Sequence, residues 1–400
     1  MQAAITAHAT HPDARMALAL AAAQADAQRA ARPGGFTPTL GLLYLSDRYA
    51  AQAEALLDDA RGRWPGVHWA GGVGVGVMAS GVEYFDEPAL VLMLLDLPAA
   101  QFSLFNGRQP LDAARADTAL VHADPATPEL EELITELAER TGAGYLFGGL
   151  AASRSRNLHI ADGVFEGGLS GVAFAAGVPL LSRVTQGCQP AGPTRRVTAA
   201  ERNLVLALDG QPALPLLLAD LGVDLEHPQQ AMAALRATLA GLSDADDAML
   251  SRGGQFGADT RVRHLIGIDP ARQGVAIADV VQPGQQLAFC RRDVAAARRD
   301  LVRICAEIRD ELEADAPVPA LPGAAPATPQ GEAPGRRIAA AVYVSCSGRG
   351  GPHFGGPSAE AQIVQHALGD VPLVGFFAGG EIARHHVYGY TGVLTVFTAD

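Results

Sequence analysis

The sequence predicts an α/β fold of repeated β-α-β-β units, forming mixed sheets flanked by helices and arranged as two related halves. Three observations support this prediction. Apolar runs of strand length alternate with helical runs along the chain. The same order of elements recurs three times, with paired glycines at or after the second strand of each copy. The 400 residues are enough for two domains with sizeable cores.

The first copy begins at Leu40. There GLLYLSDR is typical of a buried strand, AQAEALLDDA of a helix, VHWAGGVGVGV of a second strand and ALVLMLL of a third. The second copy begins near Thr118 with the strand TALVHAD. Thr127 is predicted to cap the helix that follows, with Pro128 at its first position. GYLFGGLAAS and GGLSGVAFA then complete this copy as strands.

The third copy begins at Ala339, with the strand IAAAVYVS, the helix SAEAQIVQHALG, the second strand VPLVGFFAGG and the last strand TGVLTVFT. A strand-helix-strand connection of this length predicts a right-handed crossover with parallel pairing, and the short link to the third strand predicts a hairpin. The segment between the second and third copies is less periodic, and the sequence leaves the fold of 200–250 open.

Domain limits follow from the copies and from local composition. Residues 1–35 are predicted to form an N-terminal helical extension, because AAAQADAQRAAR is alanine-rich. Residues 36–225 and 226–400 are predicted to form two domains, with their halves meeting near 185–226. The segment 314–335 is rich in Pro, Ala and Gly, which predicts a flexible surface loop.

Charge and cysteine content argue against several classes of protein. With 43 acidic and 30 basic side chains, the net charge of -13 repels nucleic acid and anionic membrane surfaces. The cysteines form no CxxC pair, so neither a disulfide framework nor a zinc site is predicted. They are Cys188, Cys290, Cys305 and Cys346. A cytoplasmic location is predicted, because Met16–Ala23 lacks the basic flank of a secretory leader and no apolar run reaches the roughly 18 residues of a membrane span.

The strongest candidate for a binding site is the glycine-rich turn SCSGRGG. Backbone N–H groups in such a turn can hold an anion, and a nearby guanidinium can bind a ligand carboxylate. Ser345, Cys346, Gly348, Arg349 and Gly350 are therefore predicted to bind ligand. The turn lacks the P-loop ending and the GxGxxG pattern, so a nucleotide is not indicated. A purely structural turn, in which glycines supply positive φ angles, is the alternative.

Two charged residues after second strands are further candidates. Glu381 follows the second strand of the third copy, where it can bind a ligand ammonium, and Arg154 follows that of the second copy. A solvated loop residue is the alternative for each. Glu381 lacks the helical spacing to His385 and His386 that a metal site would use, so no metal and no other cofactor is predicted.

A thiol-dependent enzyme is an alternative to a binding protein. Cys346 lies where a following helix and Arg349 would favour the thiolate, which would make it a nucleophile, and His353 is a candidate base seven residues on. Nothing in the spacing places His353 beside Cys346, however, and a small buried cysteine accounts for the same residue. The chain is therefore predicted to be a binding protein rather than an enzyme.

Several strings, in their order along the chain, resemble the FIST family. The first half contributes GYLFGGLAASR, GGLSGVAFA and QGCQPAGPTRRVTAAERNLVLALDGQPAL, and the second half contributes VRHLIGID, VVQPGQQLAFCRRD, SCSGRG and VGFFAGGEI. The resemblance covers about residues 36–397. It implies a FIST N-terminal domain over 36–225 and a FIST C-terminal domain over 226–400.

The resemblance implies a sensory, signal-transduction protein that binds a small ligand such as an amino acid or organic acid. We expect the ligand to lie in a cleft between the two halves. No segment is typical of an output domain, so a signalling partner protein in trans is expected. The family also occurs in F-box proteins that recruit substrates, which leaves a protein-recruiting scaffold as another alternative.

Overall fold

The computed structural model describes residues 4–32, 35–224, 226–244, 260–314 and 336–399. Of the loop predicted over 314–335, all but the first residue lies outside these ranges. Among the described residues, no helix has both the length and the apolar character needed to cross a bilayer.

The chain forms two compact units, and all three predicted copies belong to the larger one. The larger unit comprises Met1–Val184, Leu301–Val387 and Gly392–Asp400. The smaller unit comprises Thr185–Asp300 and Tyr388–Thr391. Strands from the N-terminal and C-terminal halves of the sequence therefore share one unit.

Three six-stranded mixed sheets make up the larger unit, and the first is built on the first copy. Its order is β1-β6-β2-β3-β10-β11. The strands are β1 (Ala4–Thr10), β2 (Leu40–Ser46), β3 (His68–Gly74), β6 (Ala89–Leu95), β10 (Leu158–Ala161) and β11 (Val164–Glu166). β1 pairs antiparallel with β6, so the N-terminal segment supplies an edge strand as well as the predicted helix.

The second and third sheets are built on the other two copies. The second has the order β25-β24-β9-β8-β12-β7 and the third β13-β26-β22-β23-β4-β5. Strands of the second sheet are β7 (Phe102–Phe105), β8 (Thr118–Ala123), β9 (Tyr145–Leu150), β12 (Leu169–Phe174), β24 (Glu381–Arg384) and β25 (His386–Tyr388). Strands of the third are β4 (Gly76–Ala79), β5 (Val82–Phe85), β13 (Leu180–Gln186), β22 (Arg337–Cys346), β23 (Leu373–Ala378) and β26 (Thr391–Ala399).

Parallel pairing within each copy is confirmed, whereas the predicted hairpin is wrong. The first two strands pair in parallel as β2 with β3, β8 with β9 and β22 with β23. The third strand pairs antiparallel with the first strand of its copy, as β6 with β2, β12 with β8 and β26 with β22. A separate two-stranded hairpin is inserted after the second strand of each copy and pairs with a strand of another copy. The third strand therefore pairs with the first strand instead of forming a hairpin with the second.

These inserted hairpins join the three copies in a closed cycle. The β4–β5 hairpin of the first copy pairs with β23 of the third, and β24–β25 of the third copy pairs with β9 of the second. The β10–β11 hairpin of the second copy pairs with β3 of the first. Each sheet is therefore completed by strands from another copy, which shields an edge that would otherwise expose unpaired N–H and C=O groups.

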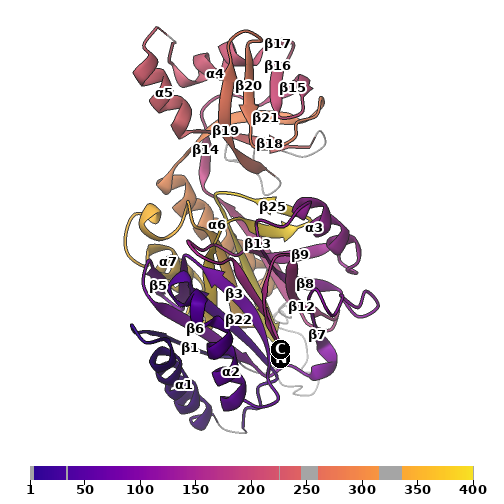
Figure 1. Cartoon of the computed structure of the whole chain (residues 1–400), viewed down its shortest axis with the longest axis vertical. Helices are drawn as coiled ribbons and strands as arrows, with labels where there is room; N and C mark the ends of the chain where they lie inside the picture. Colours follow the sequence, from indigo (N-terminus) through magenta and orange to yellow (C-terminus); the bar gives the residue numbers. More distant parts are fainter. Residues whose placement is uncertain (1–3, 33–34, 225, 245–259, 315–335, 400) are drawn as a thin grey trace, which may run out of the picture. The chain divides into compact units, whose positions relative to one another are not determined.

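Helices cover the sheets and fill the cores. α1 (Ala14–Ala30) and α2 (Ala53–Arg63) pack on the first sheet through a shared apolar cluster (Figure 1). α3 (Leu130–Glu139) begins two residues after the predicted first position, because the Thr127 hydroxyl bonds the backbone of Gly168 instead of capping the helix. Two further α-helices are α6 (Val294–Ala314) and α7 (Ala359–Leu368).

The smaller unit contains a closed ring of antiparallel strands. The ring runs β21-β15-β16-β20-β19-β18 and closes where β18 pairs with β21. Its strands are β15 (Arg195–Glu201), β16 (Leu204–Leu208), β18 (Thr238–Ser243), β19 (Arg261–Asp269), β20 (Gly274–Ile277) and β21 (Gln286–Arg292). β14 (Cys188–Pro190) and β17 (Gln211–Pro212) pair beside it, and α4 (Ala213–Leu221) and α5 (Pro228–Ala237) complete the unit.

One glycine in each second strand allows the two parallel strands to approach closely. A Cβ at these positions would lie 1.9, 2.0 and 1.8 Å from a carbonyl oxygen of the first strand of the same copy. The three glycines are Gly71, Gly148 and Gly375. Because backbone cannot move aside as a flexible side chain can, no other residue type fits without displacing the strand.

We predict that Gly148→Ala lowers the free energy of unfolding by about 3 kcal/mol or more, because it adds a backbone clash to a φ of +139°. Gly62→Ala in α2 is the matched control. Its Cβ would meet nothing within 4 Å, so the helix gains about 0.5–1 kcal/mol. Urea unfolding measures both, and equal midpoints for Gly148→Ala and the native protein would contradict the argument.

Candidate functional site

The glycine-rich turn follows β22 directly, and the backbone N–H groups of three of its residues already have acceptors. Those of Arg349 and Gly350 donate to the carbonyl of Cys346 at 3.0 and 2.8 Å, and that of Ser347 donates to Ala378 at 2.9 Å. A Cβ on Gly350 would lie 2.3 Å from the Phe377 ring. The turn thus has the tight packing of the structural alternative.

Arg349 points into the protein and forms a buried ion pair. Its Nε lies 3.3 Å from Oε1 of Glu360, and the two side chains are 2% and 0% exposed. The hydroxyl of Ser345 lies 2.9 Å from both oxygens of Glu360, and Tyr343 donates to Oε1. Glu360 therefore takes the carboxylate position that the sequence assigned to a ligand. The sequence analysis missed Glu360 because it appeared only as a helix residue.

A second carboxylate reaches the same helix from another copy. Oε1 of Glu83, on β5, accepts the N–H of Ala361 at 2.8 Å, while Oε2 is buried and has no hydrogen-bond partner among the described residues. Burial, and to a lesser degree the charge of Glu360, raise the pKa of Glu83 to about 7. The backbone N–H of Glu83 donates to the hydroxyl of Ser358 at 3.0 Å. These contacts fasten the hairpin of the first copy to α7 of the third.

The other predicted charged residues lie apart from this cluster or serve the fold. Glu381 is 0% exposed and stands opposite Gly149 in the β24–β9 pairing, so it is not a solvated loop residue. Nε and Nη2 of Arg154 bind Asp47 at 2.7 and 2.9 Å, and Nη1 lies 2.6 Å from Asp86. The hydrogen bond with Asp47 raises the pKa of Arg154 above its ordinary value.

The two residues of the thiol-enzyme alternative, Cys346 and His353, differ in exposure. Cys346 is 8% exposed at the end of β22. His353 lies on the short 3-10 helix Gly351–Phe354, is exposed, and its ring makes no hydrogen bond or ion pair with any described residue. The rings of His385 and His386 lie 3.9 Å apart, but nowhere in the described ranges do three metal-binding side chains gather.

A buried polar cluster that sequence reasoning missed lies where the sheets meet. The hydroxyl of Tyr44 lies 3.1 Å from Nε2 of His122, and Tyr44 stacks on Phe376 of the third sheet at 5.0 Å between ring centroids. Nδ1 of His159 lies 2.7 Å from the hydroxyl of Ser170. Burial and nearby His159 lower the pKa of His122 to about 3, so it stays neutral in the cell. Its contact with Tyr44 joins β8 of the second copy to β2 of the first.

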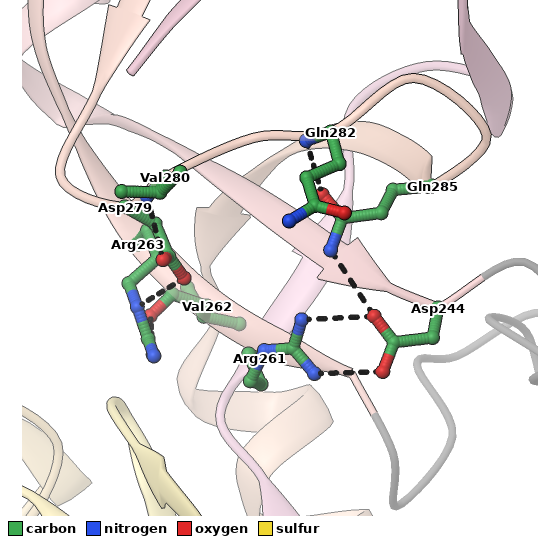
Figure 2. A network of polar contacts seen from close by, with 8 residues as sticks. All are labelled: Asp244, Arg261, Val262, Arg263, Asp279, Val280, Gln282 and Gln285. Carbon is green, nitrogen blue, oxygen red and sulfur yellow. Dashed lines mark hydrogen bonds and ion pairs between the residues drawn. The ribbon is translucent and has the colours of Figure 1, made fainter. Parts of the chain in front are cut away.

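The smaller unit contains its own polar network, at the ends of β18 and β19 (Figure 2). Nη2 of Arg261 lies 3.2 Å from Oδ1 of Asp244, and the amide of Gln285 donates to the same oxygen at 3.1 Å. Nε of Arg263 lies 2.9 Å from Oδ2 of Asp279. Because Asp244 follows β18 and Arg261 begins β19, the first pair holds the two strand ends together.

A cavity of about 550 Å³ opens in the larger unit, and none of the predicted site residues lines it. Its walls come from the starts of β8 and β9, from β13, and from β26 of the third copy. Asp117, Arg183 and Arg336 are the charged residues of its lining. We call it the β9–β13 cavity. It is lined by both sequence halves, which is a property no local motif could reveal.

Comparison with known proteins identifies the class to which this fold and these sites belong. The FIST N domain matches residues 39–211 and the FIST C domain matches 213–384. Together the two matches cover most of the chain, so the protein belongs to the FIST family. FIST domains are in general sensory domains that bind ligands in signal transduction.

Mycobacterial proteins are similar over nearly the whole length. "Uncharacterized protein Rv0628c" of Mycobacterium tuberculosis H37Rv is 30% identical over 419 residues, covering 97% of each chain. "Uncharacterized protein Mb0898c" of Mycobacterium bovis is 29% identical over 424 residues, covering 98% of this chain and 97% of its own. The similarity therefore spans both FIST ranges of this chain.

We predict that Glu83 makes stability fall as pH rises from 4.5 to about 7. Its pKa is raised in the folded protein from an ordinary 4.5 to about 7, so the folded state holds the proton more tightly. The stabilisation is complete below pH 4.5 and is lost above pH 7. Glu83→Gln keeps an acceptor for Ala361 and should be more stable than the native protein at pH 8.

Urea unfolding across this pH range tests the assignment. Glu87→Gln, which removes an exposed carboxylate beyond the same strand, is the control and should keep the native slope. An unchanged slope in Glu83→Gln would contradict the assignment.

Proposed function

We propose that the protein is a cytoplasmic sensor that binds an amino acid or related small metabolite in the β9–β13 cavity, which lies between the two sequence halves. The observation that carries the proposal is the lining of this cavity. Segments from the FIST N range supply Asp117 to Arg183, while Arg336 comes from the FIST C range and Thr395 from the end of the chain. A ligand there would contact both halves at once.

The charges of the lining suit a zwitterion. The side chain of Asp117 makes no hydrogen bond or ion pair with any described residue, so its carboxylate is available for a ligand ammonium. The basic residues of the same lining are Arg336 and Arg183, and Arg183 is held in place by Glu307 and Glu311 of α6. Opposite charges on one small cavity favour a ligand that carries both, because each ligand charge gains a partner.

The rest of the lining suits a compact apolar side chain. Phe147 and Val178 supply apolar surface. The hydroxyls of Ser182 and Thr395 lie 2.8 Å apart on the wall, and Ser182 also bonds the hydroxyl of Tyr145. Burial raises the pKa of Tyr145, which therefore remains a neutral hydrogen-bond donor. Apolar amino acids and their keto or hydroxy acids are the proposed ligand class.

The thiol-dependent enzyme and the protein-recruiting scaffold are the two alternatives, and each has its own test. A thiol enzyme would require Cys346 as its nucleophile. Cys346→Ser would then abolish the enzymatic activity while leaving ligand binding intact. A recruiting scaffold would require a protein partner in the absence of any small ligand. In the sensor proposal, a signalling partner in trans reads the ligand-bound state.

We predict saturable binding of an apolar amino acid, found by thermal-shift screening and measured by calorimetry. A ligand at 100 times its Kd adds about 2.7 kcal/mol to the free energy of unfolding. Asp117→Asn should weaken binding at least tenfold, because the ammonium loses its counter-charge. Asp310→Asn, an exposed change on α6 away from the cavity, should bind as the native protein does.

Arg349→Ala separates this cavity from the glycine-rich turn. Because Arg349 pairs with buried Glu360, its loss should lower stability by about 3 kcal/mol. The folded variant should nevertheless bind the ligand normally. If Arg349→Ala kept normal stability but lost binding, the ligand site would be in the glycine-rich turn. If a library of amino and organic acids contained no ligand, the sensor proposal would be contradicted.

A further inference from the structure

A second cavity lies in the larger unit, at the carboxyl ends of β1 and β2. Its volume is about 660 Å³. The segment before α1, the 3-10 helix Asp47–Gln52, the start of α2 and the turn after β5 form its walls. We call it the α1–α2 cavity. It shares no lining residue with the β9–β13 cavity.

Most charged groups of this cavity are already engaged. Oδ1 of Asp13 accepts the N–H of Met16 at 2.9 Å, which caps α1. Asp86 is bound by Arg154 at 2.6 Å, and Nε of Arg15 lies 3.4 Å from Asp59. These groups have partners in the protein and do not require a ligand.

Arg48 and Gln52 differ from the others. Both line the cavity, and neither side chain makes a hydrogen bond or ion pair with any described residue. Arg48 offers five N–H donors in a planar fork, and Gln52 offers an amide four residues on. The donors left over in this cavity therefore match an acceptor with two oxygens, which is the geometry of a carboxylate.

The wall beside these donors is apolar. Pro12, Ala55 and Pro88 line the cavity and are exposed or partly exposed, and the ring of Tyr49 is fixed because its hydroxyl donates to Pro88 at 3.1 Å. The carboxylates of Asp13 and Asp86, together with the net charge of -13, disfavour ligands with several negative charges. The chemistry thus selects one negative charge on a compact apolar group.

We propose that the α1–α2 cavity binds a monocarboxylate, with Arg48 and Gln52 on its oxygens and Pro12, Ala55 and Pro88 against its apolar part. This is a second site with its own ligand class: no ammonium is needed, since each aspartate of the lining already has a partner. The proposal does not depend on the β9–β13 cavity.

The test is a ¹⁹F NMR titration of the full-length protein with 4-fluorobenzoate. We expect saturable binding that Arg48→Ala weakens at least tenfold. Arg48→Lys keeps the charge but loses the fork, and should fall between the two. Arg63→Ala is the matched control, because Arg63 lies at the end of α2, is exposed and also lacks a partner among the described residues. It should bind as the native protein does.

Two further comparisons make the result decisive. Benzamide, which has the same shape without the charge, should not compete. Asp117→Asn should bind 4-fluorobenzoate normally, so failure of the sensor proposal and failure of this one remain distinguishable. No saturation, or equal binding by Arg48→Ala and the native protein, would overturn the proposal.

Discussion

The exchange of hairpins among the three copies is the constraint on which the rest of the structure depends. In each copy, the second parallel strand has an open edge, and a hairpin from another copy pairs with it. An open edge of this kind exposes unpaired backbone groups and invites aggregation. We therefore expect a single copy to lack a stable isolated form. Parts of both the FIST N and the FIST C ranges lie in the larger unit.

Many polar side chains lie at the contacts between copies. Glu83 lies on the β4–β5 hairpin and accepts a hydrogen bond from the backbone of α7. The same helix carries Glu360, which pairs with Arg349. Tyr44 and His122 join the first two sheets in the centre. Polar residues after the strands are largely used to hold the cycle together. In the β9–β13 and α1–α2 cavities, by contrast, the side chains of Asp117 and Arg48 have no partners among the described residues.

The hydrophobic periodicity and the glycines at the strand ends were sufficient to predict the three copies and their parallel strands, because these features are local. The exchange was not predictable, since the partner of a short hairpin is set by contacts far away in the sequence. Arg349 was correctly singled out as an unusual cation, yet its partner Glu360 gave only the signal of a helix residue. Asp117 and Arg48 look like ordinary loop charges in the sequence, and only the fold shows the cavities beside them.

Native-state hydrogen exchange on the intact protein tests the central claim, that the three copies form one cooperative unit. The amides of β3, β9 and β23 report on the three exchanged edges. If each edge depends on another copy, the slowest amides of all three strands should exchange through one opening with the same free energy. Exchange of β23 at a clearly lower free energy, with β3 and β9 still protected, would show that the C-terminal half opens alone and would contradict the account.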